Sequence, residues 1–254
     1  MEQPSTTTYP TASTNGFQTL KLSATSIAKG LMAVVLLLLC LHITGVLLEA
    51  VFDYDSRLTR IIVRYFDFNG EENVPAFFSS VLLLTAAALL YLIYLVHKKS
   101  MKSGSGKRYW LVLSFIFAFM AVDESVQIHE HIAEFVRPQL TSDLNGLLHW
   151  SWVVPYSFAL IAIVAFFFKW VLSLPTVARN LFFIAGAMFV MGALGLEFVE
   201  GYLYKHYGLN HIYNRVMYTL EEFLEMTAVI LFIYALLQHL ASFKQKILLT
   251  KANL

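Results

Sequence analysis

Four apolar segments of the sequence carry carboxylate and imidazole side chains of the types that bind metal ions. These segments are AVDESVQIHEHIAEF, LLHWSWVVPY, GALGLEFVEGYLY and YTLEEFLEMTAVI. Carboxylates combined with one or two imidazoles are ligands for iron, manganese or zinc, whereas oxygen ligands alone suit calcium or magnesium. The residues predicted to bind a metal are Asp123, Glu124, His131, His149, Glu197, Glu222 and Glu225. The residues predicted to act as catalytic bases or to support the ligands are Glu130, Glu200 and Glu221.

Helical spacing brings many of these side chains together. A helix turns by about 100° per residue, so most polar residues of the first segment share one face and His129 falls on the opposite side. The residues on that face are Asp123, Glu124, Gln127, Glu130, His131 and Glu134. From the helical rise, Glu124, Glu197 and Glu225 each lie roughly 22–24 Å from the cytoplasmic end of their helices. Three helices are therefore expected to place a carboxylate at one depth in the membrane.

Carboxylates at this depth need partners. One carboxylate inside the bilayer costs at least ~2.5 kcal/mol on insertion scales, so such groups face the interior of a helix bundle. The sequence supplies few bases to pair with them, since Lys205 and Arg215 lie near the rim. Carboxylates that pack together also repel one another, and a bound cation removes that repulsion. The pattern therefore favours a metal or cation site.

Parts of the pattern also have purely structural explanations. The stripe from Asp123 to Glu134 could be the solvated face of a helix that leaves the membrane. Glu221 and Glu222 could be first-turn acids favoured by the helix dipole. His149 could anchor the chain at the membrane interface together with its tryptophan neighbours. Solvation does not explain the deeper carboxylates, so the metal site remains the preferred interpretation.

Long apolar blocks must position these residues. Of the 254 residues, 58% are hydrophobic and 14% charged, less charge than a soluble domain carries. Crossing the hydrocarbon takes ~20 apolar residues, and blocks of about this kind occupy Gly30–Leu48, Ala76–Val96, Tyr109–Val122, Trp150–Leu172, Leu181–Val199 and Val216–Leu240. We predict an all-α polytopic membrane bundle of six transmembrane helices. It should occupy residues 27–242, between a disordered cytoplasmic tail (1–26) and a second cytoplasmic tail (243–254).

Charge predicts the orientation. Lys and Arg prefer cytoplasmic loops, and alternate loops hold most of them when both termini are cytoplasmic. Apart from Glu2, every Asp and Glu then falls in an outer loop or in the outer part of a span. We therefore expect a bacterial inner (plasma) membrane protein whose site faces the periplasm or exterior. The net charge of +1 gives no reason to expect nucleic acid as a partner.

Four motifs make the chain resemble a known group of proteins. NGEENVPAFFSS, DESVQIHEHI, GALGLE and EEFLEM resemble a recurrent bacterial family of multipass membrane proteins without an assigned activity, so the resemblance implies no chemistry. At class level the bundle is also similar to ferritin-like di-iron proteins, which use Glu and Glu-x-x-His from four helices. Here Glu197-x-x-Glu200 and Glu222-x-x-Glu225 stand where Glu-x-x-His is expected, which argues against a di-iron site.

Three functions are compatible with this pattern. The preferred hypothesis is a metal-dependent membrane oxidoreductase or hydrolase that uses iron, zinc or manganese and acts on a lipid-like or other membrane-soluble substrate. The alternatives are a cation or proton-coupled transporter or channel, and a non-catalytic accessory subunit. Membrane lipids are the expected surroundings in every case, and the oligomeric state is not predicted.

Overall fold

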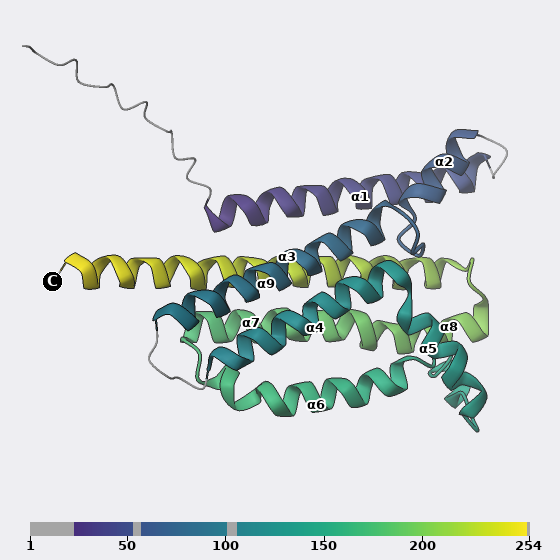
Figure 1. The fold of residues 1–254 in the computed structure, drawn as a ribbon. Helices are drawn as coiled ribbons and strands as arrows, with labels where there is room; N and C mark the ends of the chain where they lie inside the picture. The colour runs from purple at the N-terminus through teal and green to yellow at the C-terminus, as the bar shows by residue number, and fades with distance from the viewer. Residues whose placement is uncertain (1–22, 53–56, 101–105, 253–254) are drawn as a thin grey trace, which may run out of the picture.

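The computed structural model describes residues 23–52, 57–100 and 106–252, and these residues form helices joined by turns, with no strand among them (Figure 1). The α-helices are α1 (Ala24–Phe52), α2 (Arg57–Phe66), α3 (Val74–Ser100), α4 (Lys107–Val126), α5 (Ile128–Val136), α6 (Val153–Leu172), α7 (Thr176–Val190), α8 (Glu197–Tyr207) and α9 (Ile212–Ala252). The shorter elements are the 3-10 turns η2 (Arg137–Gln139) and η3 (Leu144–Gly146) and the π-helix η4 (Met191–Leu196).

Six helical stretches are long and apolar enough to cross a membrane. They are Ala24–Val51, Val74–Lys98, Lys107–Val126, Val153–Leu172, Thr176–Tyr207 and Ile212–Ser242. The predicted all-α bundle with six spans is therefore confirmed. The third span is longer than the apolar block that predicted it, because the helix continues through the polar residues that follow Val122.

The first helix begins and the last helix finishes at the same end of the bundle. Helix α1 begins, and α9 finishes, at the left in Figure 1. The segment 243–252, predicted as a tail, continues α9 as helix. Most of the predicted N-terminal tail, residues 1–22, lies outside the described residues. Which end of the bundle faces the cytoplasm stays a prediction.

The core lies along α9. Its buried face follows helical spacing, with Met226, Ile233 and Leu236 each less than 2% exposed. These residues belong to one cluster with apolar residues of α3 and α1, such as Leu82, Leu90 and Val35. Many large apolar side chains point outward instead, Phe158 and Ile161 of α6 among them. An apolar exterior of this kind fits a bundle whose surroundings are lipid.

The turn after α5 packs closely against α8 at two glycines. Gly146 has a φ of +100°, and a Cβ added to Gly201 would lie 2.5 Å from the Gly146 carbonyl oxygen. The same added Cβ would lie 3.0 Å from the Cβ of His149. A side chain at either glycine would therefore force the two backbone segments apart.

Gly201→Ala is expected to destabilise the protein by about 1–3 kcal/mol, because the new methyl group meets backbone rather than a flexible side chain. The measurement is the thermal unfolding midpoint in detergent. Gly186→Ala is the matched control, since an added Cβ there meets nothing within 4 Å and alanine favours the helix. Equal midpoints for the two variants would contradict this account of the turn.

Candidate metal centre

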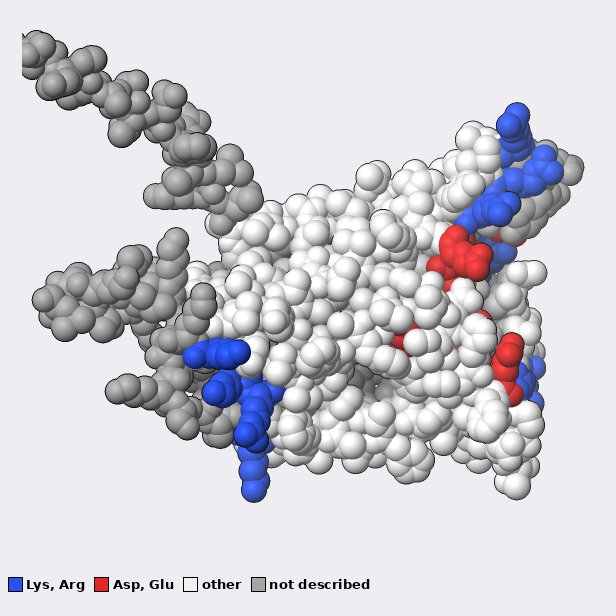
Figure 2. All heavy atoms as spheres, in the orientation of Figure 1, with Lys and Arg blue, Asp and Glu red and all other residues white. Residues whose placement is uncertain are grey.

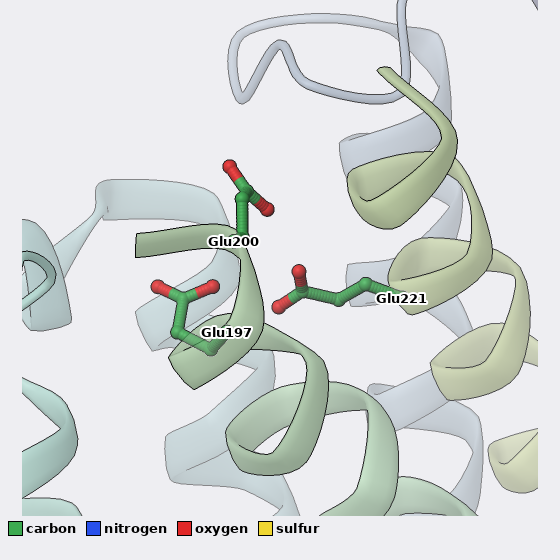
Figure 3. A group of neighbouring side chains, drawn as sticks. All are labelled: Glu197, Glu200 and Glu221. Carbon is green, nitrogen blue, oxygen red and sulfur yellow. The ribbon is translucent and has the colours of Figure 1, made fainter. Parts of the chain in front are cut away.

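Three carboxylates meet between α8 and α9. Potential ligand oxygens of Glu197, Glu200 and Glu221 all lie within 4.8 Å of one another. Glu221 points from α9 toward the two glutamates of α8 (Figure 3). Glu200 is 4% exposed and Glu221 is 8% exposed, so solvation does not account for their position. We call these three residues the glutamate trio.

A π-helix sets the direction of the α8 glutamates. Helix η4 separates α7 from α8, and Glu197 is the first residue of α8. A π-helix is wider than an α-helix and is frequent at functional sites. Its residue Gly192 lies against α9, where an added Cβ would be 3.2 Å from the Glu221 carbonyl oxygen and 2.9 Å from the Cγ of Glu225. The GALGLE segment thus brings α8 and α9 close together.

The trio has its own hydrogen bonds. The indole Nε1–H of Trp152 donates to Glu197 Oε1 over 2.9 Å. Glu197 and Glu221 are also within hydrogen-bonding contact of each other. Two carboxylates can make such a contact only if they share a proton or hold a cation between them.

Further carboxylates lie beside the trio toward the middle of the bundle. Glu222 and Glu225 of α9 are half-buried, and Glu124 of α4 interacts electrostatically with both. Glu124 also hydrogen-bonds the Ser79 side chain of α3. The structure therefore brings the deep carboxylates of three spans into one acidic region, as the depth estimate from the sequence anticipated.

No arginine or lysine is seen to neutralise this region in the described part of the chain. The basic residues nearest to it in the sequence form ion pairs with other carboxylates. Lys205 Nζ lies 2.7 Å from Asp143 Oδ2, and the guanidinium of Arg215 lies 2.6 Å from Glu49 Oε2.

His129 is the cation that does face the carboxylates. Its backbone N–H donates to Asp123 Oδ1 over 2.8 Å, and its Nδ1 lies 3.2 Å from the same oxygen. Its Nε2 lies 3.5 Å from Glu71 Oε1. Tyr156 donates its hydroxyl to the other oxygen of Asp123 over 2.8 Å. With these partners, Asp123 is occupied by protein groups rather than available to a metal.

The charge of His129 follows from these neighbours. Burial of the ring disfavours protonation, but hydrogen bonds to Asp123 and Glu71 and the charges of both carboxylates outweigh it and raise the pKa of His129 to about 10. The imidazole is therefore a cation at neutral pH.

The inward position of His129 corrects the prediction that it lies opposite the acidic face. That prediction assumed one unbroken helix. In the structure α4 ends at Val126, the next residue, Gln127, has a left-handed φ of 58° and ψ of 42°, and α5 starts in a new direction. Helical spacing therefore does not carry across Gln127, and His129 takes the place that the spacing assigned to His131.

The two predicted histidine ligands have other partners. His131 is exposed, and its Nδ1 lies 2.7 Å from the Gln127 carbonyl oxygen. His149 packs on Trp150 and Tyr204, and burial together with the charge of Arg137 lowers its pKa. Among the described residues, the His, Cys, Asp and Glu side chains close enough to share one ion include neither histidine.

Glu130 and Glu71 meet at the outer rim. Glu130, predicted as a base, is exposed on α5 and lies close to Glu71. Partial burial and the charge of Glu71 raise the pKa of Glu130. From the sequence Glu71 looked like an ordinary solvated loop acid, yet its Oε2 is buried and has no hydrogen-bond partner among the described residues. No local sequence signal marked Glu71, His129 or Trp152 as part of this region.

Comparison with known proteins gives one match. A sequence model of a domain of unknown function (DUF8692) matches residues 28–240, a range that contains every predicted site residue. No curated protein and no solved structure matches the chain.

Proposed function

The chain belongs to the DUF8692 family, whose function is unknown, and from the site itself we propose that it is a metal-dependent membrane enzyme. The observation that carries the proposal is the glutamate trio: three carboxylates whose oxygens converge within 4.8 Å inside two membrane-spanning segments. Carboxylates in such a place are expensive and are a mark of function in membrane proteins.

The spacing and chemistry of the trio fit a divalent cation. Oxygen ligands at about 2.0–2.6 Å from an ion can be at most about 4–5 Å apart, which matches the 4.8 Å limit within which the trio lies. Oxygen donors alone suit manganese, magnesium or calcium better than zinc. Because the predicted histidines do not join the trio, manganese is favoured over zinc, with iron between them.

Different residues of the chain would have different roles at such a centre. The trio would hold the ion, and the Trp152 N–H fixes the orientation of Glu197. A bound ion would act as a Lewis acid toward a substrate oxygen or a water molecule. Glu130, exposed at the rim next to Glu71, is the base that remains once Glu200 and Glu221 act as ligands.

A membrane-soluble substrate follows from where the trio lies. Glu197 and Glu200 belong to the span Thr176–Tyr207, and Glu221 belongs to the span Ile212–Ser242. A lipid-like molecule that diffuses in the bilayer reaches this level directly. Whether the reaction is oxidation or hydrolysis depends on the ion that binds.

Orientation is part of the same proposal. On the face shown in Figure 2, the described Asp and Glu residues lie toward the end that carries α2 and none is seen at the opposite end, whereas Lys and Arg are seen at both ends. This polarity supports a cytoplasmic location for both termini and a site that faces the periplasm or exterior.

Transport is less well supported. A permeation path would have to continue from the acidic region through the half of the bundle near the chain ends. That half is filled by buried apolar side chains of α3 and α9, such as Leu90, Ile93 and Leu236. The buried hydroxyl of Ser114 there donates to the Ala87 carbonyl oxygen.

Elemental analysis of the full-length protein, purified in detergent, tests the proposal. We expect about one equivalent of a divalent metal, manganese or iron first, after dialysis against metal-free buffer. Glu72→Gln should leave the metal content unchanged, because Glu72 is an exposed loop residue. Protein that binds no stoichiometric metal when supplied with manganese, iron or zinc would overturn the proposal.

A further inference from the structure

The short helix α2 presents three distinct faces. Its sequence, RLTRIIVRYF, places one set of residues against the protein, a second set of exposed apolar residues beside it, and a third set of arginines. The arginines are Arg57, Arg60 and Arg64, and we call them the arginine stripe. Their spacing of three and four residues puts them on one side of the helix.

The first face fixes α2 to the end of α1. Thr59 is fully buried. A Cβ added to Gly45 of α1 would lie 3.2 Å from Ile62 Cγ2 and 3.4 Å from Val63 Cγ2, so the two helices are in close contact. Helix α2 is therefore a fixed part of the bundle and holds its other two faces in place.

The second face continues the lipid-facing surface. Leu58, Ile61 and Tyr65 of α2 are exposed, with Leu58 at 59%. On α1 beside them, Leu47 and Val51 are exposed as well. A soluble surface would not keep this run of large apolar groups in water, so the apolar face of α2 lies against lipid.

The third face carries charge that the described protein does not neutralise. All three arginines of the stripe are exposed. The ion pairs formed within the described residues use other cations, namely His42, His129, Lys205 and Arg215. Figure 2 shows the stripe as a blue ridge on α2 at the end of the molecule.

The stripe lies at the level of lipid headgroups. Helix α1 has 29 residues, a length of about 43 Å, while the hydrocarbon layer is only ~30 Å thick. The apolar run of α1 ends at Leu48, before Glu49, so it is the last turn of α1 that extends into the headgroup layer, and α2 packs beside this end of α1. Arginine binds phosphate through two parallel hydrogen bonds, and phosphates are the anions available at this level.

We propose that α2 is a binding site for anionic phospholipid. The arginine stripe binds the headgroup phosphates, and Leu58, Ile61 and Tyr65 contact the upper part of the acyl chains. A free phosphate ion would use the stripe but not the apolar face, so the two faces together favour the lipid. This site is separate from the metal centre and does not depend on it.

Local lipid enrichment tests the proposal. Cys40→Ser removes the single cysteine, and Leu47→Cys then carries a fluorescent label on the exposed surface of α1, which packs beside α2. The full-length protein is placed in phosphatidylcholine nanodiscs that contain a minor share of brominated phosphatidylglycerol or, in a parallel sample, brominated phosphatidylcholine. We expect the phosphatidylglycerol to quench the label several-fold more strongly.

Three variants decide the outcome. Arg57→Gln/Arg60→Gln/Arg64→Gln should weaken the preference by about 100-fold in affinity, given the attraction of each arginine to an anionic surface. Replacing the same three residues by lysine should keep most of it. Arg108→Gln/Lys169→Gln/Arg179→Gln, which removes equal charge at the other end of the bundle, should keep all of it. Equal quenching by both lipids in the parent protein would overturn the proposal, and so would a preference for phosphatidylglycerol that survives the stripe variant. Loss of this preference on adding glycerol phosphate would show instead that the arginine stripe binds free phosphate.

Discussion

Glu221→Gln is expected to be more stable than the wild type without metal and less stable than the wild type with metal. In the metal-free protein, the substitution removes one of three carboxylates that converge within 4.8 Å, so repulsion falls and the unfolding midpoint rises. With metal present, the wild type gains the binding free energy, which amounts to about 2.7 kcal/mol at a metal concentration 100 times the dissociation constant. The variant lacks one ligand and gains far less. Thermal unfolding of both proteins, with chelator and with manganese, gives the four midpoints required.

The matched control for this experiment is Glu72→Gln. The chemical change is the same, but Glu72 is exposed in the loop before α3, so its midpoints should follow those of the wild type in both conditions. The crossing of stabilities distinguishes a metal site from a set of acids that merely share protons. If Glu221→Gln shifted the midpoint by the same amount with chelator and with metal, the trio would not be a metal site.

His129→Gln is expected to cost on the order of 3 kcal/mol at neutral pH, because it leaves Asp123 and Glu71 near each other without their cation. In the wild type the imidazole lies between the two carboxylates, 3.2 Å from one and 3.5 Å from the other. Glutamine keeps a hydrogen-bond donor there but brings no charge. The free energy of unfolding in detergent gives the measurement.

The pH dependence identifies the cause of this loss. The folded-state pKa of His129 is raised to about 10 from the ordinary value of 6.5. Its contribution to the free energy of unfolding is therefore fully present below pH 6.5 and disappears as the pH rises through about 10. The stability difference between the wild type and His129→Gln should therefore shrink between these values.

His131→Gln provides the control for both measurements. His131 lies two residues further along α5, is exposed, and contacts the Gln127 carbonyl rather than a carboxylate. Its substitution should leave the stability and its pH dependence close to the wild type. A larger effect at His131 than at His129 would show that α4 and α5 form one continuous helix and that the break at Gln127 is wrong.

The residues differ in how far their roles could be predicted. Glu124, Glu197 and Glu225 were expected to lie together because hydropathy and helical rise place them at one depth, and the structure brings them into one region. The histidines could not be predicted in the same way. The left-handed conformation of Gln127 occurs without the glycine or asparagine that usually signals it. The sequence therefore does not show the turn that directs His129, rather than His131, toward the carboxylates.

Glu71 illustrates a second limit. In the sequence it stands in a polar loop with Asn69, Gly70 and Glu72, where a carboxylate is normally solvated. The fold brings this loop against α5, and there Glu71 contacts His129 and Glu130. Contacts between segments so far apart in the chain leave no periodic pattern in either segment.

The sequence by itself determined the spans, their number and the concentration of acid among them, because bilayer thickness and the cost of charge in hydrocarbon act on each segment separately. Only the tertiary structure decided which carboxylates converge and which imidazole faces them. Those outcomes depend on the π-helix before Glu197 and on the break at Gln127, and side chains from elsewhere in the chain bond carboxylates close to both. Trp152 bonds Glu197, and Tyr156 bonds the Asp123 that holds His129. A ligand set is defined by distances between helices, and those distances are fixed only when the helices pack.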